Sequence, residues 1–517
     1  MGSVRGPLAC LAWLFCMGSV ATSGVGGGVQ SGSVTFTALH TYYMSATGSD
    51  SNNGTSAATA WATPNHQVVC GDVIVAASGT YTSSFGTWGT VSNCPSTSGG
   101  IDGAGGIWMA VVLCGGSDLE SCKTTNKLWG MNKSNWAVEG WKVTNPGTGS
   151  GSRAFELDGS GGLIHHLALI NDVAFNVASG FHSDDGGKTG AFGVDYWASV
   201  GNIAQNAAQN DSFCEAAIDA VGIGVLDTNA GTHVFFDGNF SYANTATGCG
   251  SDTEDYMVDT LDQHNVNSQI VLSNNIGFGA DRECIHTFWQ QISTNTPTIK
   301  IYNNTCYQNN VNTHGDFAWG EIDNTTNDGT GTVNNPWIIT VKNNLAYQPL
   351  SASAGGGRVY AYMVTNVSAG LTVSGNFFRA NSTVCPSHCN STYDVLSWGT
   401  LAELNTSGNT YTKPAFTNTT DLLANRLGVP NCAGFTTTTK CMGYDPNTPV
   451  LTTPSIISDL VPTASGTSGK GYQLPSTTCA ANPDYPTWLK GIVYLHWNSG
   501  TSTITENGGL VTKPCGM

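Results

Sequence analysis

Ser273-Asn274-Asn275-Ile276 is one copy of a short motif that returns along the middle of the chain. In most copies a Gly or Asn precedes a marker residue, and an apolar residue or Thr follows it. Successive markers lie roughly 30 to 40 residues apart, and repeats of that length are typical of solenoids, propellers and arrays. The markers are Gly140, His166, Asn202, Asn239, Asn275, Asn304, Asn344, Asn376 and Asn409.

The segments between the markers favour strands. They hold short β-branched and apolar runs separated by Gly, Asn, Thr and Ser, with almost no helical periodicity. This pattern predicts stacked coils of parallel strands, in which one Asn per coil bonds to the Asn above and below it. Asn also favours tight turns and tolerates left-handed backbone, which explains the marker without a ladder. Both interpretations place the marker in a turn of an all-β solenoid.

The N-terminal part carries a resemblance to a known family. Tyr42-Tyr43-Met44-Ser45 leads to Gly48-Ser49-Asp50, and Cys70-Gly71-Asp72-Val73-Ile74 follows. These stretches resemble the entry segment of right-handed parallel β-helix proteins of the pectate-lyase-like superfamily. Together with the Asn-marked coils, the resemblance covers about residues 42–425. It implies an all-β fold, a single right-handed parallel β-helix, and it says little about activity because one fold hosts many functions.

Four segments divide the chain. Residues 1–21 read as a signal peptide, with one Arg, a short apolar stretch and small residues at the cleavage site. Residues 22–41 are Gly/Ser-rich and expected to be flexible. Residues 42–425 form the predicted β-helix, and 426–517 form an irregular tail expected to be disulfide-tied and packed on the helix. Loss of Cys10 and Cys16 with the signal leaves 14 of the 16 cysteines, an even number that fits disulfides in a secreted protein.

Composition limits the possible partners. Only 10% of residues are charged and the net charge is −17, one unit more negative once Arg5 leaves with the signal. Such a chain is a poor ligand for nucleic acid. No later segment is apolar for long enough to predict a membrane span. We expect a secreted monomer whose partner is an extracellular polysaccharide. Several Asn-x-Ser/Thr sequons make it a candidate glycoprotein.

A second strand aligned on the markers carries acids. In a parallel solenoid, equivalent positions of successive coils lie about 4.8 Å apart. The alignment therefore predicts an exposed column, whose like charges would repel unless a cation or a shared proton relieves them. Ordinary strand alternation, with polar residues outside by default, is the alternative. The predicted column contains Asp158, Asp184, Asp219, Asp259, His286 and Glu321.

The resemblance also implies a chemistry. Lyases of this superfamily use a metal ion or an arginine to neutralise a uronate carboxylate, and a Lys or Arg then removes a proton. On that basis the candidate catalytic residues are Lys188, Arg282 and His286. The candidate substrate-binding residues are Asp184, Glu321, Trp319 and Tyr362. A Ca²⁺ ion, which takes 6–8 oxygen ligands, would use Asp219, Glu254, Asp255 and Asp259.

Two other functions stay open. A glycoside hydrolase needs an acid and a base roughly 6.5–9.5 Å apart for inversion, and pairs within the column such as Asp219 and His286 lie near that range. A non-catalytic surface or matrix protein could bind glycan along the same groove. Whether Lys188 or Arg282 reaches the acidic column separates these functions, because a lyase without either cation has no base.

Overall fold

A computed structural model describes the coils of the solenoid and parts of the tail. The described residues are 38–82, 85–95, 107–116, 121–125, 129–144, 153–184, 186, 192–207, 215–242, 244, 253–259, 269–289, 298–310, 318–326, 338–348, 358–364, 370–380, 395–397, 408–411, 471, 484–489, 492 and 495–506.

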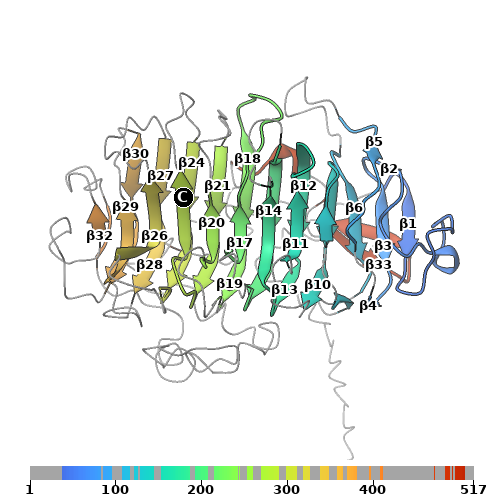
Figure 1. The fold of residues 1–517 in the computed structure, drawn as a ribbon, viewed down its shortest axis with the longest axis horizontal. Coiled ribbons are helices and arrows are strands. Elements are labelled where there is room, and N and C mark those ends of the chain that lie inside the picture. The colour runs from blue at the N-terminus through green and yellow to red at the C-terminus, as the bar shows by residue number, and fades with distance from the viewer. Residues whose placement is uncertain are drawn as a thin grey trace, which may run out of the picture.

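Three long sheets, parallel throughout, form the body (Figure 1). From Ala110 onward each coil contributes one strand to each sheet, so the chain is a single right-handed parallel β-helix, as the sequence predicts. The first sheet contains β1 (Thr41–Met44), β3 (Val73–Ala76), β6 (Ala110–Cys114), β9 (Trp136–Glu139), β12 (Ile164–Ile170), β15 (Val194–Val200), β18 (Thr232–Asp237), β21 (Gln269–Ser273), β24 (Thr298–Tyr302), β27 (Ile338–Lys342) and β30 (Leu371–Ser374).

The second and third sheets repeat this order. The second sheet contains β4 (Gly79–Tyr81), β7 (Cys122–Thr124), β10 (Trp141–Thr144), β13 (Val173–Phe175), β16 (Ile203–Gln205), β19 (Phe240–Tyr242), β22 (Ile276–Phe278), β25 (Thr305–Tyr307), β28 (Leu345–Gln348) and β31 (Phe377–Ala380). The third sheet contains β8 (Trp129–Met131), β11 (Arg153–Asp158), β14 (Ser179–Asp184), β17 (Ile218–Ala220), β20 (Tyr256–Val258), β23 (Ile285–Trp289), β26 (Ala318–Thr326), β29 (Arg358–Val364) and β32 (Val395–Ser397).

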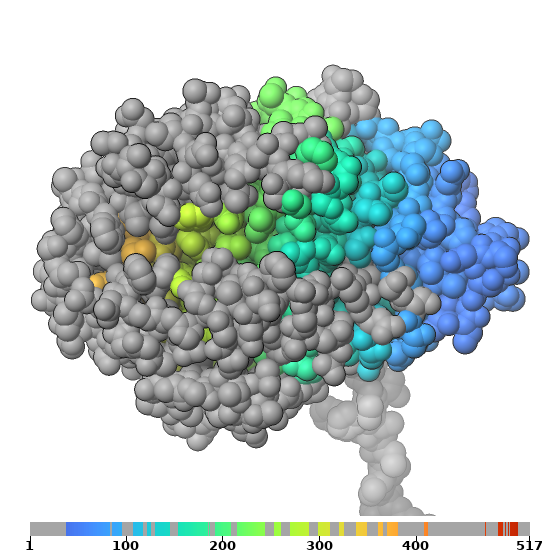
Figure 2. Space-filling view, in the orientation of Figure 1, coloured from blue at the N-terminus to red at the C-terminus, as the bar shows by residue number. Residues whose placement is uncertain are grey.

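Smaller elements flank the body. Strand β2 (Val68–Val69) pairs with β5 (Val91–Ser92), β33 (Leu495–Asn498) pairs antiparallel with β34 (Thr503–Glu506), and the 3₁₀ turns are η1 (Ala57–Thr59) and η6 (Thr487–Leu489). Figure 2 shows the described atoms of the middle coils as one continuous band, from the cyan coils to the yellow ones. Within the described residues, none of the helical turns could cross a membrane.

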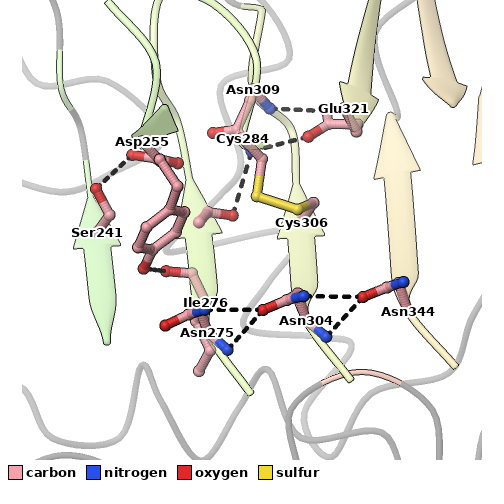
Figure 3. The surroundings of a disulfide bond; sticks show 12 residues. Ser241, Asp255, Asn275, Ile276, Cys284, Asn304, Cys306, Asn309, Glu321 and Asn344 are labelled. Atoms are coloured by element: carbon pink, nitrogen blue, oxygen red, sulfur yellow. Dashed lines mark hydrogen bonds between the residues drawn. A yellow bond between two sulfur atoms is a disulfide. The ribbon is translucent and has the colours of Figure 1, made fainter. Parts of the chain in front are cut away.

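The predicted asparagine ladder is present at the turn between the first and second sheets (Figure 3). The side-chain amide of Asn275 donates to Asn304 Oδ1 at 3.0 Å, and Asn304 donates to Asn344 Oδ1 at 3.0 Å. The same bond joins Asn239 to Asn275, Asn344 to Asn376 and Asn376 to Asn409. Backbone N–H groups of the markers donate to the same oxygens, so each coil is bonded to the next by side chain and main chain together.

The residue before each marker explains the Gly/Asn doublet. Asn274, Asn303 and Asn343 have φ near 55°, and Gly238 and Gly375 have φ near 66°. This left-handed region costs most residues energy, but Gly enters it freely and Asn tolerates it. The turn therefore needs one residue that accepts a left-handed backbone and, directly after it, an asparagine whose side-chain amide bonds to the next coil. These two requirements together produce the repeated motif.

Two predicted markers were wrong. Strand register pairs Lys142 with Val173 and Val173 with Ile203, so Asp172 occupies the ladder position where His166 was expected. Asp172 donates its N–H to Asn202 Oδ1 at 2.8 Å and accepts from the N–H of Trp141. In the preceding coil Trp141, not Gly140, therefore has the marker position.

The core fills the space between the sheets with inward-facing apolar side chains. In the third sheet Phe155, Phe181 and Ile218 follow one another on β11, β14 and β17, and the Phe155 and Phe181 rings stack 4.8 Å apart. Disulfides join Cys70 to Cys94, Cys114 to Cys122 and Cys284 to Cys306, which indicates an oxidising compartment.

Part of the C-terminal tail lies against the first sheet. Trp488 donates to Thr232 O at 3.0 Å, and Asp484 accepts from Lys300 Nζ and Tyr302 Oη at 2.6 Å each. The segment boundaries predicted above stay predictions, because the expected signal peptide and most of residues 426–517 lie outside the described residues.

Candidate functional site on the third sheet

One face of the third sheet concentrates ionisable side chains. Along β11 the residues Phe155 and Leu157 point into the core, so Glu156 between them points away from it. Strand pairing aligns Glu156 with residues of the next coils, and we call this set the outer row. The outer row consists of Glu156, His182, Asp219, Met257, His286 and Asp323.

The outer row corrects the predicted column. Asp219 and His286 do share a row, but both are buried where an exposed column was predicted. Asp158 pairs with Asp184 two residues further along the strands. Asp259 follows Met257 by two residues and lies just after β20, half-buried, with its N–H donating to Ala220 O. The alignment was wrong there because it slid these acids by two residues, a shift that preserves the side-chain face and so goes unnoticed in the sequence.

Arg153 gathers three carboxylates at one end of this face. Its Nε lies 3.0 Å from Glu215 Oε1, and its Nη1 lies 2.5 Å from Glu156 Oε1 and 2.8 Å from Asp184 Oδ2. Burial alone would raise the pKa of Glu215, but the positive charges of His182 and Arg153 lower it. Asp184, a predicted substrate-binding residue, is thus already held in an ion pair.

His182 and Asp219 form a buried pair beside Arg153. The His182 Nδ1 and Asp219 Oδ1 atoms are 2.5 Å apart, and both side chains are almost completely buried. Burial alone would lower the pKa of His182, but the carboxylate of Asp219 raises it. Burial raises the pKa of Asp219, a predicted calcium ligand, which lies against this histidine.

Glu254, Glu283 and His286 form a second group, which we call the Glu-Glu-His cluster. Each residue offers a ligand atom, and these atoms lie within 4.8 Å of one another. The His286 Nδ1 atom is 3.2 Å from Glu254 Oε1. All three residues are buried: Glu254 is 1% exposed, Glu283 0% and His286 7%.

The electrostatics of the Glu-Glu-His cluster are uneven. Burial raises the pKa of Glu283 well above its ordinary value, and the charge of Glu254 raises it further. Burial would also raise the pKa of Glu254, but the hydrogen bond from His286 and the positive charges of His286 and Arg282 lower it. Arg282 is 6% exposed, and its positive charge lowers the pKa of both glutamates.

Two predicted site residues lie in a corner between sheets instead (Figure 3). Asp255 accepts from Ser241 Oγ at 2.7 Å and Asn244 Nδ2 at 2.8 Å. Glu321 accepts from Asn309 Nδ2 at 2.8 Å and from the Asn309 N–H at 2.9 Å. Both side chains are fully buried in this corner, and strand register aligns neither residue with the outer row.

The remaining predicted residues divide into two groups. Tyr362 is fully buried in the core, stacks on Phe378 with ring centroids 5.2 Å apart and donates to Asn324 Oδ1, so it is not on the outer face. Lys188 lies outside the described residues, and for Trp319 only the backbone is described, as part of β26.

The calcium prediction is only partly matched. Of the four proposed ligands, Glu254 lies in the Glu-Glu-His cluster, while Asp219 pairs with His182, Asp255 lies in the corner, and Asp259 follows β20. An acidic and histidine site is present, but these four residues do not surround one point. A histidine nitrogen is also an unusual donor for calcium, which prefers oxygen ligands.

Glu283, Glu215 and Arg153 were not among the predicted site residues. Glu254 and Glu283 each stand two residues before an inward-facing residue. Those two residues, Tyr256 and Ile285, pair on adjacent strands, and this shared position is the signal that identifies Glu283. Glu215 offered no such signal, since it precedes its strand by three residues and reaches Arg153 two coils away.

No protein-family model matches the sequence. No curated protein matches it either. One solved structure to which the chain is similar is the crystal structure of pectate lyase Pel9A, at 13% identity and a TM-score of 0.35, covering 88% of this chain and 96% of that chain. The activity in that title belongs to that protein, and the function of this chain is argued below from its own residues.

Proposed function

We propose that this chain is a secreted polysaccharide lyase that cleaves a uronate-containing polymer by β-elimination on the outer face of the third sheet. The observation that carries the proposal is the position of Arg282. It is a buried cation next to Glu283, and its charge acts on the acids of the same face. A lyase needs such a cation, and a surface that only displayed acids would repel an anionic polymer.

The proposed reaction assigns one role to each predicted cation. Arg282 faces the uronate carboxylate and neutralises it, which makes the neighbouring C–H more acidic. A base takes that proton, the electron pair of the C–H bond forms the new double bond, and the glycosidic oxygen leaves. An arginine keeps its proton in proteins, so Lys188 is the better candidate for the base.

Substrate binding would use the acidic and aromatic residues around this face. The Asp184 side chain is 26% exposed, whereas Glu321 and Tyr362 are fully buried, and Asp184 lies at the end of β14 beside Arg153. We retain Trp319 as a candidate ring for stacking on sugars, whereas Glu321 and Tyr362 are assigned to the corner and the core.

The test is a panel of uronate and neutral polysaccharides incubated with purified protein. Elimination creates an unsaturated product that absorbs near 235 nm, and its appearance together with new reducing ends is the expected result. Reducing ends without absorbance would overturn the proposal in favour of hydrolysis. Binding without any cleavage would overturn it in favour of a non-catalytic glycan-binding protein.

Variants of the cations locate the site. Arg282→Gln should lower the elimination rate about 100-fold, the usual effect of removing one charge-stabilising donor. Lys188→Ala should abolish it. Arg379→Gln is the matched control, because Arg379 lies on β31 of the second sheet and should leave the rate unchanged. Equal rates in Arg282→Gln and Arg379→Gln would refute the assignment.

A further inference from the structure

The Glu-Glu-His cluster leaves buried polar atoms unsatisfied. Both carboxylate oxygens of Glu283, one oxygen of Glu254 and Nε2 of His286 have no hydrogen-bond partner. Glu283 is completely buried, and an unpaired buried charge is so costly that proteins neutralise it or bind an ion to it. The three residues come from adjacent coils, at the start of β20 and on or before β23, so the solenoid itself brings their ligand atoms within 4.8 Å.

The charge around the cluster also favours a cation. Asp323 is buried and pairs with His286 on the neighbouring strand, and its charge raises the pKa of both Glu283 and His286. With every group ionised, the three acids Glu254, Glu283 and Asp323 exceed the two cations Arg282 and His286 by one negative charge in a dry environment. A divalent ion at the cluster would remove that excess and satisfy the unpaired oxygens together.

The donor set distinguishes between ions. Calcium and magnesium select oxygen ligands and tend to keep several of them, whereas an imidazole beside carboxylates suits zinc and its first-row neighbours. Zinc sites with three protein ligands commonly combine His and Glu and leave one position for water or substrate. The hydrogen bond from His286 to Glu254 is of the kind that orients a metal-bound histidine.

We propose that Glu254, Glu283 and His286 form a binding site for a divalent first-row transition ion such as Zn²⁺. The site is separate from the predicted calcium ligands Asp219, Asp255 and Asp259. It does not depend on the proposed lyase activity, because a bound ion here would stabilise the fold whether or not the chain cleaves a polymer.

The experiment measures the metal directly. Full-length mature protein is stripped with a chelator, incubated with Zn²⁺, Mn²⁺ or Ca²⁺ and desalted, and the metal content and melting temperature are recorded. We expect about one Zn²⁺ per chain and a melting temperature that rises with Zn²⁺ concentration, since an ion that binds only the folded state stabilises it. Co²⁺ in place of Zn²⁺ should give visible absorption bands that report its ligands.

Variants connect the signal to these residues. Glu283→Gln and His286→Asn should each weaken Zn²⁺ binding at least 10-fold and change the Co²⁺ bands. Glu321→Gln is the matched control, another fully buried glutamate, but one that is satisfied by Asn309, and it should bind Zn²⁺ like the wild type. If Glu283→Gln fails to fold, as judged by its circular dichroism, Glu283→Asp replaces it, because it keeps a shorter carboxylate and should weaken binding while preserving the charge.

Three outcomes would overturn the inference. If the wild type retained no Zn²⁺, protonation of Glu283 alone would account for its burial without a metal ion. Equal Zn²⁺ binding by wild type, Glu283→Gln and His286→Asn would place the ion elsewhere. A larger stabilisation by Ca²⁺ than by Zn²⁺ or Mn²⁺ would refute the choice of ion. Loss of lyase activity alone would overturn nothing here, so failure of the proposed function stays distinguishable.

Discussion

Replacing Asn275 by Ala tests the ladder that joins the coils. The Asn275 side chain makes four hydrogen bonds: its Oδ1 accepts from the N–H and the amide of Asn239, and its Nδ2 donates to Phe236 O and Asn304 Oδ1. After the change the amide of Asn239 still has Ser199 O, and Asn304 Oδ1 still accepts from the Asn275 N–H. The backbone N–H of Asn239 and one of the two N–H groups of its amide lose their acceptor, and Asn239 is buried.

The magnitude follows from that inventory. Each of the two orphaned buried donors costs about 1–3 kcal/mol, and the small cavity adds about 1 kcal/mol. We therefore expect Asn275→Ala to lower the free energy of unfolding by about 3 to 7 kcal/mol. The assay is urea unfolding followed by tryptophan fluorescence, read as a shift of the midpoint with an unchanged slope.

Asn65→Ala is the control for that assay. Asn65 is exposed and lies outside the ladder, so this change should alter stability by less than about 0.5 kcal/mol. If Asn275→Ala were as stable as Asn65→Ala, the amide would contribute nothing, and the ladder would be only a consequence of the turn preference of Asn.

Two further changes probe buried charge and covalent closure. Burial raises the pKa of Asp237 to about 7, so the folded carboxyl keeps its proton up to about pH 7 while the unfolded one loses it near pH 4. Ionisation of Asp237 should therefore lower wild-type stability as pH rises from 4 to 7. Asp237→Asn should remove this contribution and melt higher than wild type at pH 8, and an unchanged pH dependence of the melting temperature would contradict it. The double variant Cys284→Ala/Cys306→Ala opens a loop with a sequence separation of 22 residues and should lose about 3 kcal/mol in urea unfolding, whereas an unchanged midpoint would show that the corner holds without the bond.

The solenoid could be predicted from the sequence because its signal is local. Each turn needs a residue that accepts positive φ followed by one with a bonding amide, and both demands show in neighbouring letters, as in Asn303-Asn304. His166 was misread as a marker for the same reason: its neighbourhood is apolar, but the hydrogen bonds that identify Asp172 join residues 30 apart.

The candidate site was harder to predict because it depends on register. Segments of unequal length join the sheets, so counting from the marker does not say where each third-sheet strand begins. For that reason the prediction grouped Asp158, Asp184 and Asp259 with the column, although they lie two residues beyond the outer row. Glu321 instead accepts a hydrogen bond from Asn309 in the corner between sheets. Only pairing with the adjacent coil could have revealed that Glu283 stands beside Glu254.

The ladder has a direction, and this makes the coils interchangeable units. From Asn239 to Asn376 every side-chain amide donates toward the C-terminal neighbour and every Oδ1 accepts from the N-terminal one. At the N-terminal end stands Asp172, whose carboxylate accepts from the N–H groups of Trp141 and Ile170. An aspartate side chain lacks the amide NH2 group with which each asparagine donates to the next, so an aspartate can begin the series but would interrupt it if placed in the middle. A coil bounded by two asparagine markers can therefore be duplicated or removed as a module without breaking the polarity of the series, which is a simple route by which such a chain could lengthen.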